Sequence, residues 1–219
     1  MNYIPYVNIQ SFEGNKSYDL FSLLLKERII LIQGEINDDL AGLIVGELLY
    51  LSALSQEEKI TIYINSPGGS VTAGLAIYDV IKSSPCIIET IGLGLCASMG
   101  AFLLSSGSKG HRLAYPNCEI MIHQPLGGFE GQVTDMDIMN KRYLYLKNRL
   151  IELLANHTDK QKEKIALDTE RNYFLTAKEA IEYGLIDKII KSLFFLNFSA
   201  FSWSDVKIWL TPDLDNLIA

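Results

Sequence analysis

The 219-residue sequence predicts one α/β domain built on a largely parallel β-sheet. Three observations predict this class. Short runs rich in β-branched residues alternate with longer segments whose apolar residues recur at helical spacing. The short runs are apolar throughout, as expected for strands that are buried on both faces. No fixed-period repeat and no low-complexity linker divides the chain, which favours one domain over two.

The expected elements alternate between strands and helices, so crossover connections should make most strand pairs parallel. The first helix is expected to begin at Asn37 and Asp38, which are typical of a helix cap. In chain order the expected segments are strand 28–32, helix 37–54, strand 60–64, helix 71–84, strand 86–91, helix 98–106, strand 119–123 and helix 134–157.

Two segments differ from this pattern. The glycine-rich segment GGFEGQVTD (127–135) leads into the last helix, which is too long for one layer of a compact domain. We therefore expect an extended arm, which a monomer would rarely build for itself. The final segment, 192–219, is rich in aromatic residues and nearly without basic ones. If it is exposed, such a segment calls for a partner.

Composition argues against several classes of protein. The net charge of −7 argues against nucleic-acid binding, which normally uses a basic patch. The amino-terminal sequence shows no signal pattern, and no apolar run approaches the roughly 20 residues that span a bilayer. Cys86, Cys96 and Cys118 are odd in number and lack a CxxC pair, which argues against a disulfide framework or a zinc site. We expect a cytoplasmic protein with free thiols, no bound metal and no membrane contact.

The segment NSPGGS (65–70) follows an expected strand and precedes an expected helix. Gly68 and Gly69 permit backbone conformations that other residues avoid, so amide N–H groups there can point into a pocket. An ordinary turn built on Pro-Gly is the alternative interpretation.

Ser98 lies within GLCASMGAFLLSSG (94–107), at the expected start of a helix. A serine in this position is ordinarily an N-cap. It can also be a nucleophile whose oxyanion is stabilised by the N–H of Met99 and by the helix dipole.

His123 ends the strand in EIMIHQPLGG (119–128), at the edge where open α/β sheets place their sites. It is either a structural residue or the base that a serine nucleophile requires. The other two histidines, His111 and His157, stand in polar segments and are expected to be exposed.

Taken together, four segments resemble the ClpP family of ATP-dependent serine proteases. The resemblance extends from about Ile4 to Ile190, which is most of the chain. The segments that carry it are INSPGGSVTAGLAIYDVI, GLCASMGAFLLSSGSKGHRLAYPN, MIHQPLGG and ERNYFLTAKEAIEYGLID.

For the fold, this resemblance implies a crotonase-like (β/α) head domain with a projecting strand–helix handle, in a single domain over residues 1–191. The implied parts are an N-terminal segment 1–17, a head of about 18–123 and 158–191, a handle of about 124–157, and a tail 192–219 with no assigned role.

For assembly, the resemblance implies heptameric rings that stack face to face into a tetradecamer and enclose a proteolytic chamber. An Hsp100-class AAA+ unfoldase, such as ClpX, ClpC or ClpA, feeds unfolded polypeptide into that chamber. The unfoldase uses the ATP, so the chain itself is expected to need no cofactor. A second ClpP paralogue is a further candidate partner.

For the site, the resemblance implies that Ser98 is the nucleophile, that His123 is the general base, and that the amides of Gly69 and Met99 form the oxyanion hole. The remaining implied roles are substrate backbone binding at Gly68, Ser70, Val71, Leu126 and Gly127, ring–ring contact at Glu170 and Arg171, and unfoldase docking at Leu49 and Tyr63.

The sequence departs from the family pattern at three places. Asn172 occupies the position of the triad Asp, which normally accepts from His Nδ1–H and stabilises the imidazolium. An Asn can accept the same hydrogen bond but carries no charge, so we expect weakened activity by the isolated protein. Ser83 replaces a larger apolar residue in the docking region, and the tail after Ile190 is longer and more aromatic than usual.

Two alternatives remain open from the sequence. One is a structural or regulatory subunit that forms rings and needs an active paralogue ring for chemistry. The other is an acyl-CoA enzyme of the wider crotonase group, which shares the glycine-containing oxyanion hole.

Overall fold

The computed structural model of the chain describes residues 5–11, 14–128, 130–190 and 206–207. Two compact units divide the chain. The first comprises residues 1–29 and 194–219, and the second comprises residues 30–193. The predicted N-terminal segment and C-terminal tail lie partly outside the described residues, and the predicted domain boundaries stay a prediction.

The first unit contains a small antiparallel sheet in the strand order β10-β1-β2. The hairpin of β1 (Tyr6–Ser11) and β2 (Gly14–Asp19) places Tyr6 opposite Asp19, and β10 (Val206–Lys207) pairs with β1. Helix α1 (Leu20–Lys26) follows β2 directly, because the Asp19 side chain caps it by accepting a hydrogen bond of 3.0 Å from the N–H of Ser22.

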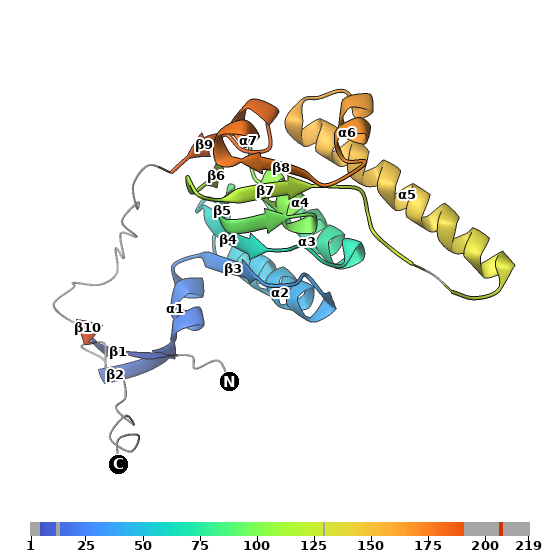
Figure 1. Cartoon of the computed structure of the whole chain (residues 1–219). Helices are drawn as coiled ribbons and strands as arrows, with labels where there is room; N and C mark the ends of the chain where they lie inside the picture. Colours follow the sequence, from blue (N-terminus) through green and yellow to red (C-terminus); the bar gives the residue numbers. More distant parts are fainter. Residues whose placement is uncertain (1–4, 12–13, 129, 191–205, 208–219) are drawn as a thin grey trace, which may run out of the picture. The chain divides into compact units, whose positions relative to one another are not determined.

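The second unit is built on a largely parallel sheet, as the sequence predicts (Figure 1). Its main strands run in the order β3-β4-β5-β6-β9, with β7 paired to β5 and β8 paired antiparallel to β7. The pairs β4–β5, β5–β6, β5–β7 and β6–β9 are all parallel. The strands are β3 (Ile29–Gln33), β4 (Ile60–Ser66), β5 (Ile88–Ala97), β6 (Arg112–Ala114), β7 (Glu119–Ile122), β8 (Tyr173–Thr176) and β9 (Lys188–Ile189).

Side-chain caps begin some of the helices of this unit, and a glycine ends the last one. Asn37 Oδ1 accepts from Leu40 N–H at 2.9 Å, and Thr176 forms a capping box with Glu179. Gly184 ends the last helix in the left-handed region that favours glycine. The helices are α2 (Asp38–Leu54), α3 (Val71–Ser83), α4 (Met99–Ser105), α5 (Val133–Thr158), α6 (Lys162–Asp168) and α7 (Ala177–Tyr183).

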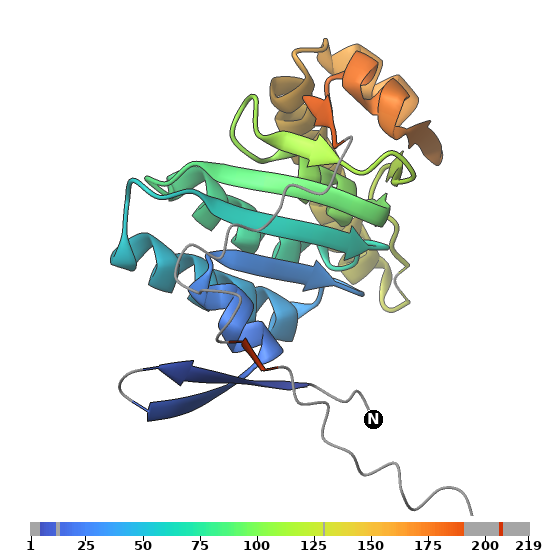
Figure 2. The same cartoon turned by 90° about the vertical axis from the view of Figure 1, so that its left-hand side faces the viewer.

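The main sheet is covered unequally on its two faces. Figure 2 looks onto one face, with α2 and α3 behind the strands. In β4, Ile60, Ile62 and Ile64 are fully buried, whereas Thr61 and Tyr63 on the opposite face are only half-buried. The expectation that these strands are buried on both faces is therefore wrong for β4, because the side chains on its second face remain partly accessible in the single subunit.

The long helix predicted over 134–157 is α5, which spans 26 residues. Its second half, which buries Leu146, Leu150 and Leu154, packs against α4 and α6, while its first half extends away from them (Figure 1). Apolar side chains on that first half are exposed, with Ile138 at 59% and Tyr145 at 67%. No helix in the described part of the chain has the length and apolarity needed to cross a membrane.

A buried ion pair joins Arg112, the first residue of β6, to Asp187, which directly precedes β9. The guanidinium of Arg112 binds both carboxylate oxygens of Asp187, at 2.6 and 3.0 Å. The same guanidinium donates to the carbonyl oxygens of His157 and Gly184. Burial alone would raise the pKa of Asp187, but the hydrogen bonds from Arg112 outweigh it, so the pKa is lowered. β6, β9 and the end of α5 are thus tied to one side chain.

The expectation that His157 is exposed is wrong. The residue is only 6% exposed, because the last turn of α5 packs against α3 and α4. Burial, with smaller contributions from the charges of Lys82 and Arg112, lowers the pKa of His157 to about 3. The imidazole is therefore neutral in the folded protein at all but strongly acidic pH.

Folding should weaken in acid because of this histidine. The unfolded chain takes up a proton on His157 below about pH 6.5, whereas the folded chain does so only near pH 3. Stability is therefore lost as pH falls through that window, by about 1.6 kcal/mol between pH 6.5 and 5. Urea unfolding followed by circular dichroism at several pH values measures the loss.

The matched variants for this prediction are His157→Phe and Ser106→Ala. Removal of the imidazole should abolish this part of the pH dependence. Ser106→Ala removes a buried hydroxyl without any titrating group, so it should keep the full pH dependence. Equal pH dependence in wild type and His157→Phe would show that the histidine does not cause it.

Candidate active site

The turn after β4 is held in place by side-chain and backbone hydrogen bonds. Ser66 Oγ donates to the carbonyl of Gly34 at 2.6 Å and accepts from the N–H of Gly68 at 3.1 Å. Residue Ile36 pairs with this turn, donating to Gly68 O at 2.8 Å and accepting from Ser70 N–H at 2.7 Å. The NSPGGS turn is therefore fixed by hydrogen bonds to both Gly34 and Ile36.

Gly68 brings this turn against the junction of β5 and α4. A Cβ atom at Gly68 would stand 2.6 Å from Ser98 Cβ and 2.8 Å from the carbonyl oxygen of Ala97. Gly68 also has φ of +97°, and Gly69 has φ of +151°, where a Cβ would meet the backbone of Ile36. Only glycine allows both the close approach and the backbone conformation.

Ser98 stands at the strained turn between β5 and α4. Its φ of 54° and ψ of −120° are unusual for a residue with a side chain. Its N–H donates to Met121 O on β7 at 2.8 Å, which holds the turn. Ser98 is the N-cap residue of α4, as one interpretation of the sequence expects, but its hydroxyl makes no capping hydrogen bond. The side chain is half-buried.

Two amide groups next to the contact between Gly68 and Ser98 have no acceptor among the described residues: that of Met99, which follows Ser98, and that of Gly69, which follows Gly68. Met99 is the first residue of α4, where an amide lacks a partner within the helix. Two such donors on adjoining segments can bind an anionic oxygen.

His123 and Asn172 lie just beyond one end of the ladder between two neighbouring strands. The antiparallel ladder of β7 and β8 ends with Ile122 opposite Tyr173. His123 directly follows Ile122, and Asn172 directly precedes Tyr173. The segment before Asn172 is fixed by Gln124, whose N–H donates to Thr169 O at 2.6 Å and whose side chain donates to Glu170 O at 2.9 Å.

No direct hydrogen bond joins the side chains of Ser98, His123 and Asn172 among the residues that the structure describes. His123 is half-buried and Asn172 is exposed. Catalytic hydrogen bonds are often long or poorly aligned before substrate binds. The structure thus brings the three residues to one edge of the sheet without aligning them.

A narrow apolar pocket opens beside Ser98 and His123. Its lining comes from four segments that are distant in the sequence, and the sequence analysis did not identify most of it. Single apolar residues at helical spacing carry no signal that separates a pocket wall from an ordinary core position. The lining residues are Val71, Ser98, Met99, Phe102, Ile122, His123, Pro125, Leu150 and Leu154.

The predicted substrate-binding segments border this pocket. Ser70 already uses its backbone within the subunit, since its N–H donates to Ile36 O and its carbonyl accepts from Gly74 N–H at 3.0 Å. On the other side, Leu126 is 79% exposed, and Gly127 is exposed beside the ring of Tyr143 on α5. Residues 123–128 form no strand ladder within the described part of the chain.

Glu170 and Arg171, the predicted ring contacts, lie in the exposed loop before β8. Within the subunit, Glu170 accepts a hydrogen bond of 3.0 Å from Lys147 on α5. This contact lowers the pKa of the Glu170 carboxyl. The loop next to Asn172 is thus linked to the long helix.

The predicted docking residues lie on different layers. Leu49 is 58% exposed on α2, whereas Tyr63 lies on the partly accessible face of the sheet. Ser83, the docking-region departure, is exposed at the end of α3. The sequence does not indicate the companions of Tyr63, because they come from three different strands or strand ends. This open-face cluster consists of Ile91, Leu113, Ile190, Tyr63 and Tyr115.

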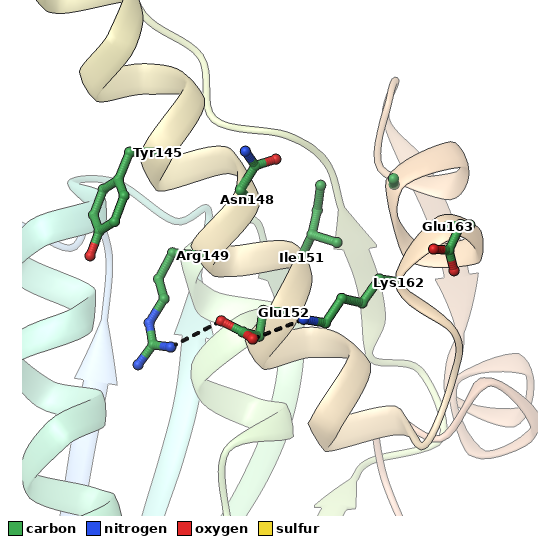
Figure 3. Close-up of a pocket in the computed structure, with 8 residues that line it drawn as sticks. Tyr145, Asn148, Arg149, Ile151, Glu152, Lys162 and Glu163 are labelled. Carbon is green, nitrogen blue, oxygen red and sulfur yellow. Dashed lines mark hydrogen bonds and ion pairs between the residues drawn. The ribbon is translucent and has the colours of Figure 1, made fainter.

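A second cavity, about 420 Å³ in volume, lies between α5 and α6 (Figure 3). Arg149 and Lys162 both reach Glu152 there, at 3.2 and 2.8 Å. None of the predicted site residues lines it. No group of three or more His, Cys, Asp or Glu side chains that could hold a metal ion exists among the described residues.

Comparison with known proteins identifies one family. A family model described as Clp protease matches residues 12–193. The match covers most of the chain, including the turn at Gly68 and all three residues Ser98, His123 and Asn172. The predicted α/β fold class agrees with this family and with the mostly parallel sheet.

The Gly68→Ala substitution should destabilise the protein strongly. The new Cβ would overlap Ser98 and Ala97 in a backbone region that disfavours side chains, which together cost about 2–5 kcal/mol. Gly46→Ala is the matched control, because Gly46 is an exposed residue of α2 with nothing within 4 Å of a new Cβ. It should stabilise by about 0.5–1 kcal/mol. Urea unfolding of both variants measures the difference, and equal effects would contradict the close approach.

Proposed function

The chain belongs to the Clp protease family, and from that premise we propose that it is a serine endopeptidase subunit that cleaves unfolded polypeptides inside a chamber of stacked heptameric rings. One observation carries the proposal. Ser98, at a strained turn with its hydroxyl uncommitted, shares a pocket with His123 beside two amides that have no acceptor.

The chemistry follows from these groups. His123 takes the proton of the Ser98 hydroxyl as Oγ attacks the scissile carbonyl carbon. The amides of Gly69 and Met99 donate to the oxyanion that forms. His123 then gives its proton to the leaving amine, and water hydrolyses the acyl-enzyme with the same histidine as the base.

Asn172 is the third member of this triad in our proposal. Its position next to the end of the β7–β8 ladder supports this role, because it faces the strand end that carries His123. An amide oxygen accepts from His123 Nδ1–H but adds no negative charge to stabilise the imidazolium. Autonomous activity is therefore low.

The substrate lies as an added strand between the Gly68–Val71 segment and the Leu126–Gly127 segment. Because Ser70 already uses its backbone groups, we assign the main-chain contacts on the first side to Gly69 and Val71. The pocket next to Ser98 accepts the side chain that precedes the scissile bond. Its walls of Phe102, Leu150 and Leu154 favour an apolar side chain there.

Assembly completes the enzyme in this proposal. The exposed first half of α5 supplies the ring–ring contact, together with Glu170 and Arg171. The open-face cluster around Tyr63, together with Leu49, docks the loops of an Hsp100-class unfoldase such as ClpX, ClpC or ClpA. The unfoldase hydrolyses the ATP, and this chain uses no cofactor of its own.

We also assign the protein to the cytoplasm. The free thiols of Cys86, Cys96 and Cys118 are all buried in the described residues, which supports a reducing compartment.

A second candidate is a structural or regulatory subunit that needs an active paralogue ring. This candidate is supported by the absence of direct hydrogen bonds among Ser98, His123 and Asn172 in the described residues. The acyl-CoA alternative has no such support, since the family match is to Clp proteases.

Asn172→Asp should raise peptide cleavage at least tenfold. The restored carboxylate would stabilise the imidazolium, and the same exchange in a well-characterised serine protease triad changes kcat by about 10⁴, which sets the upper limit. Turnover of a fluorogenic peptide by isolated tetradecamers measures the gain. Asn148→Asp is the matched control, because it adds the same charge on an exposed face of α5.

No gain in Asn172→Asp with intact tetradecamers would contradict the weakened-triad proposal. A fluorophosphonate probe for reactive serine separates it from the structural alternative. Labelling that is lost in Ser98→Ala supports the protease. Absence of labelling in both homomeric and mixed rings would instead support the structural subunit.

Tyr63→Ala should uncouple the unfoldase without affecting peptide cleavage. Loss of the aromatic side chain from the open-face cluster should lower unfoldase-driven degradation of a folded substrate at least tenfold. Small-peptide turnover should stay within about twofold. Leu167→Ala, which removes an exposed apolar side chain from α6, is the control and should change neither rate. An unchanged rate in Tyr63→Ala would rule out docking at this cluster.

A further inference from the structure

Three helices meet at a buried cluster of rings behind the candidate active site. His157 of α5 lies 5.4 Å from the ring centroids of both Tyr78 on α3 and Phe102 on α4, and the latter two are 5.1 Å apart. All three side chains are at most 9% exposed. None of them belongs to the triad or to the oxyanion hole.

The hydrogen bonds of this cluster determine the tautomer of His157. Ser105 Oγ lies 2.8 Å from Phe102 O, which can only accept, so the single hydroxyl proton of Ser105 points there. Ser105 Oγ therefore accepts from His157 Nδ1–H, across 2.9 Å. On the other side of the ring, the Tyr78 hydroxyl lies 3.4 Å from Nε2. His157 is neutral, with its proton on Nδ1.

This bond joins the two helices that form the walls of the pocket. Helix α4 carries Ser98 at its N-terminal end and Ser105 as its last residue. Helix α5 carries Leu150 and Leu154, which precede His157 by seven and three residues and so share its helix face. Phe102 belongs both to the ring cluster and to the pocket lining.

The end of α5 is held at a second point as well. Arg112, paired with Asp187, donates to the carbonyl oxygen of His157 at 2.7 Å. That contact fixes the position of the last turn along the axis of α5. The ring of His157 fixes which face of α5 turns toward α4. Rotation of α5 about its axis would move Leu150 and Leu154 relative to Phe102.

We propose that His157 is a positioning residue for substrate selectivity. Its hydrogen bond to Ser105 fixes the rotation of α5 against α4 and thereby the width of the pocket beside Ser98. The proposal rests on the protease function argued above. His157 itself touches neither substrate nor the reacting atoms.

Ser105→Ala and Ser106→Ala provide a matched test. Both serines are buried, adjacent at the end of α4, and both donate a hydroxyl to the backbone three residues earlier. Only Ser105 contacts His157. Two fluorogenic peptides that differ only in Leu or Ala before the scissile bond are compared by kcat/KM. In Ser105→Ala we expect the Leu-to-Ala ratio to fall about three- to tenfold, mainly through KM for the Leu peptide. In Ser106→Ala it should stay within about twofold.

His157→Phe supplies an independent variant, because it keeps a ring in the cluster and removes only the polar atoms. It should reproduce the loss of selectivity. The double variant with Ser105→Ala should lose no more than either single variant, since both remove the same bond. Additive losses, or an unchanged ratio despite a lower melting temperature, would show a merely structural role and overturn the proposal.

Hydrogen exchange provides a readout that needs no activity. Amides in residues 146–158 should exchange at least about fivefold faster in Ser105→Ala than in Ser106→Ala, because α5 is less firmly held. If wild-type rings cleave neither peptide, the protease proposal fails. The exchange comparison then decides alone whether this bond fastens α5 to α4. Equal exchange in the two variants would overturn that inference.

Discussion

The close approach of Gly68 to the junction of β5 and α4 is the constraint on which the candidate site depends. At 2.6 Å from Ser98 Cβ, there is no room for a side chain at Gly68. This approach brings the Gly68–Gly69 turn against the segment of Ser98 and Met99. The strain at Ser98 and the positive φ at both glycines persist because Ile36, Ser66 and Met121 hold the segments through hydrogen bonds. These hydrogen bonds thus fix the backbone around Ser98, while its hydroxyl makes no capping hydrogen bond.

The other groups of the site depend on weaker connections. His123 and Asn172 lie beyond the end of a short ladder, where strand pairing no longer fixes side chains. The loop of Asn172 is linked through Glu170 to Lys147 of α5, the helix whose first half exposes apolar side chains. An ion pair between exposed groups contributes little stability by itself. In the ring assembly proposed above, a subunit that covers the exposed half of α5 would reach the loop of Asn172 through the contact between Lys147 and Glu170.

Two buried ionisable groups near the site, Arg112 and His157, avoid an uncompensated charge in different ways. Arg112 is nearly buried but meets both oxygens of Asp187 and two carbonyl groups. His157 has no carboxylate partner, and burial keeps it neutral with a pKa of about 3. A charged imidazole there would face Lys82 and Arg112 without compensation. The neutral ring instead uses both nitrogens in hydrogen bonds, and these connect three helices.

The sequence by itself determined the strand–helix order, the parallel sheet, the long helix and the segments that carry Ser98 and His123. These features follow from local patterns: apolar periodicity, the cap at Asn37, and glycines where the backbone turns sharply. The family resemblance added the position of Asn172, and the family match to residues 12–193 confirmed the family. Contacts between distant segments were decided only by the tertiary structure. The pocket walls at Phe102, Leu150 and Leu154, the uncovered face at Tyr63 and the burial of His157 each depend on how separate elements pack. The residues next to a position in the sequence do not show which side chains pack against it from another helix. His157 stands in a polar segment and was therefore expected to be exposed, but it lies in the core.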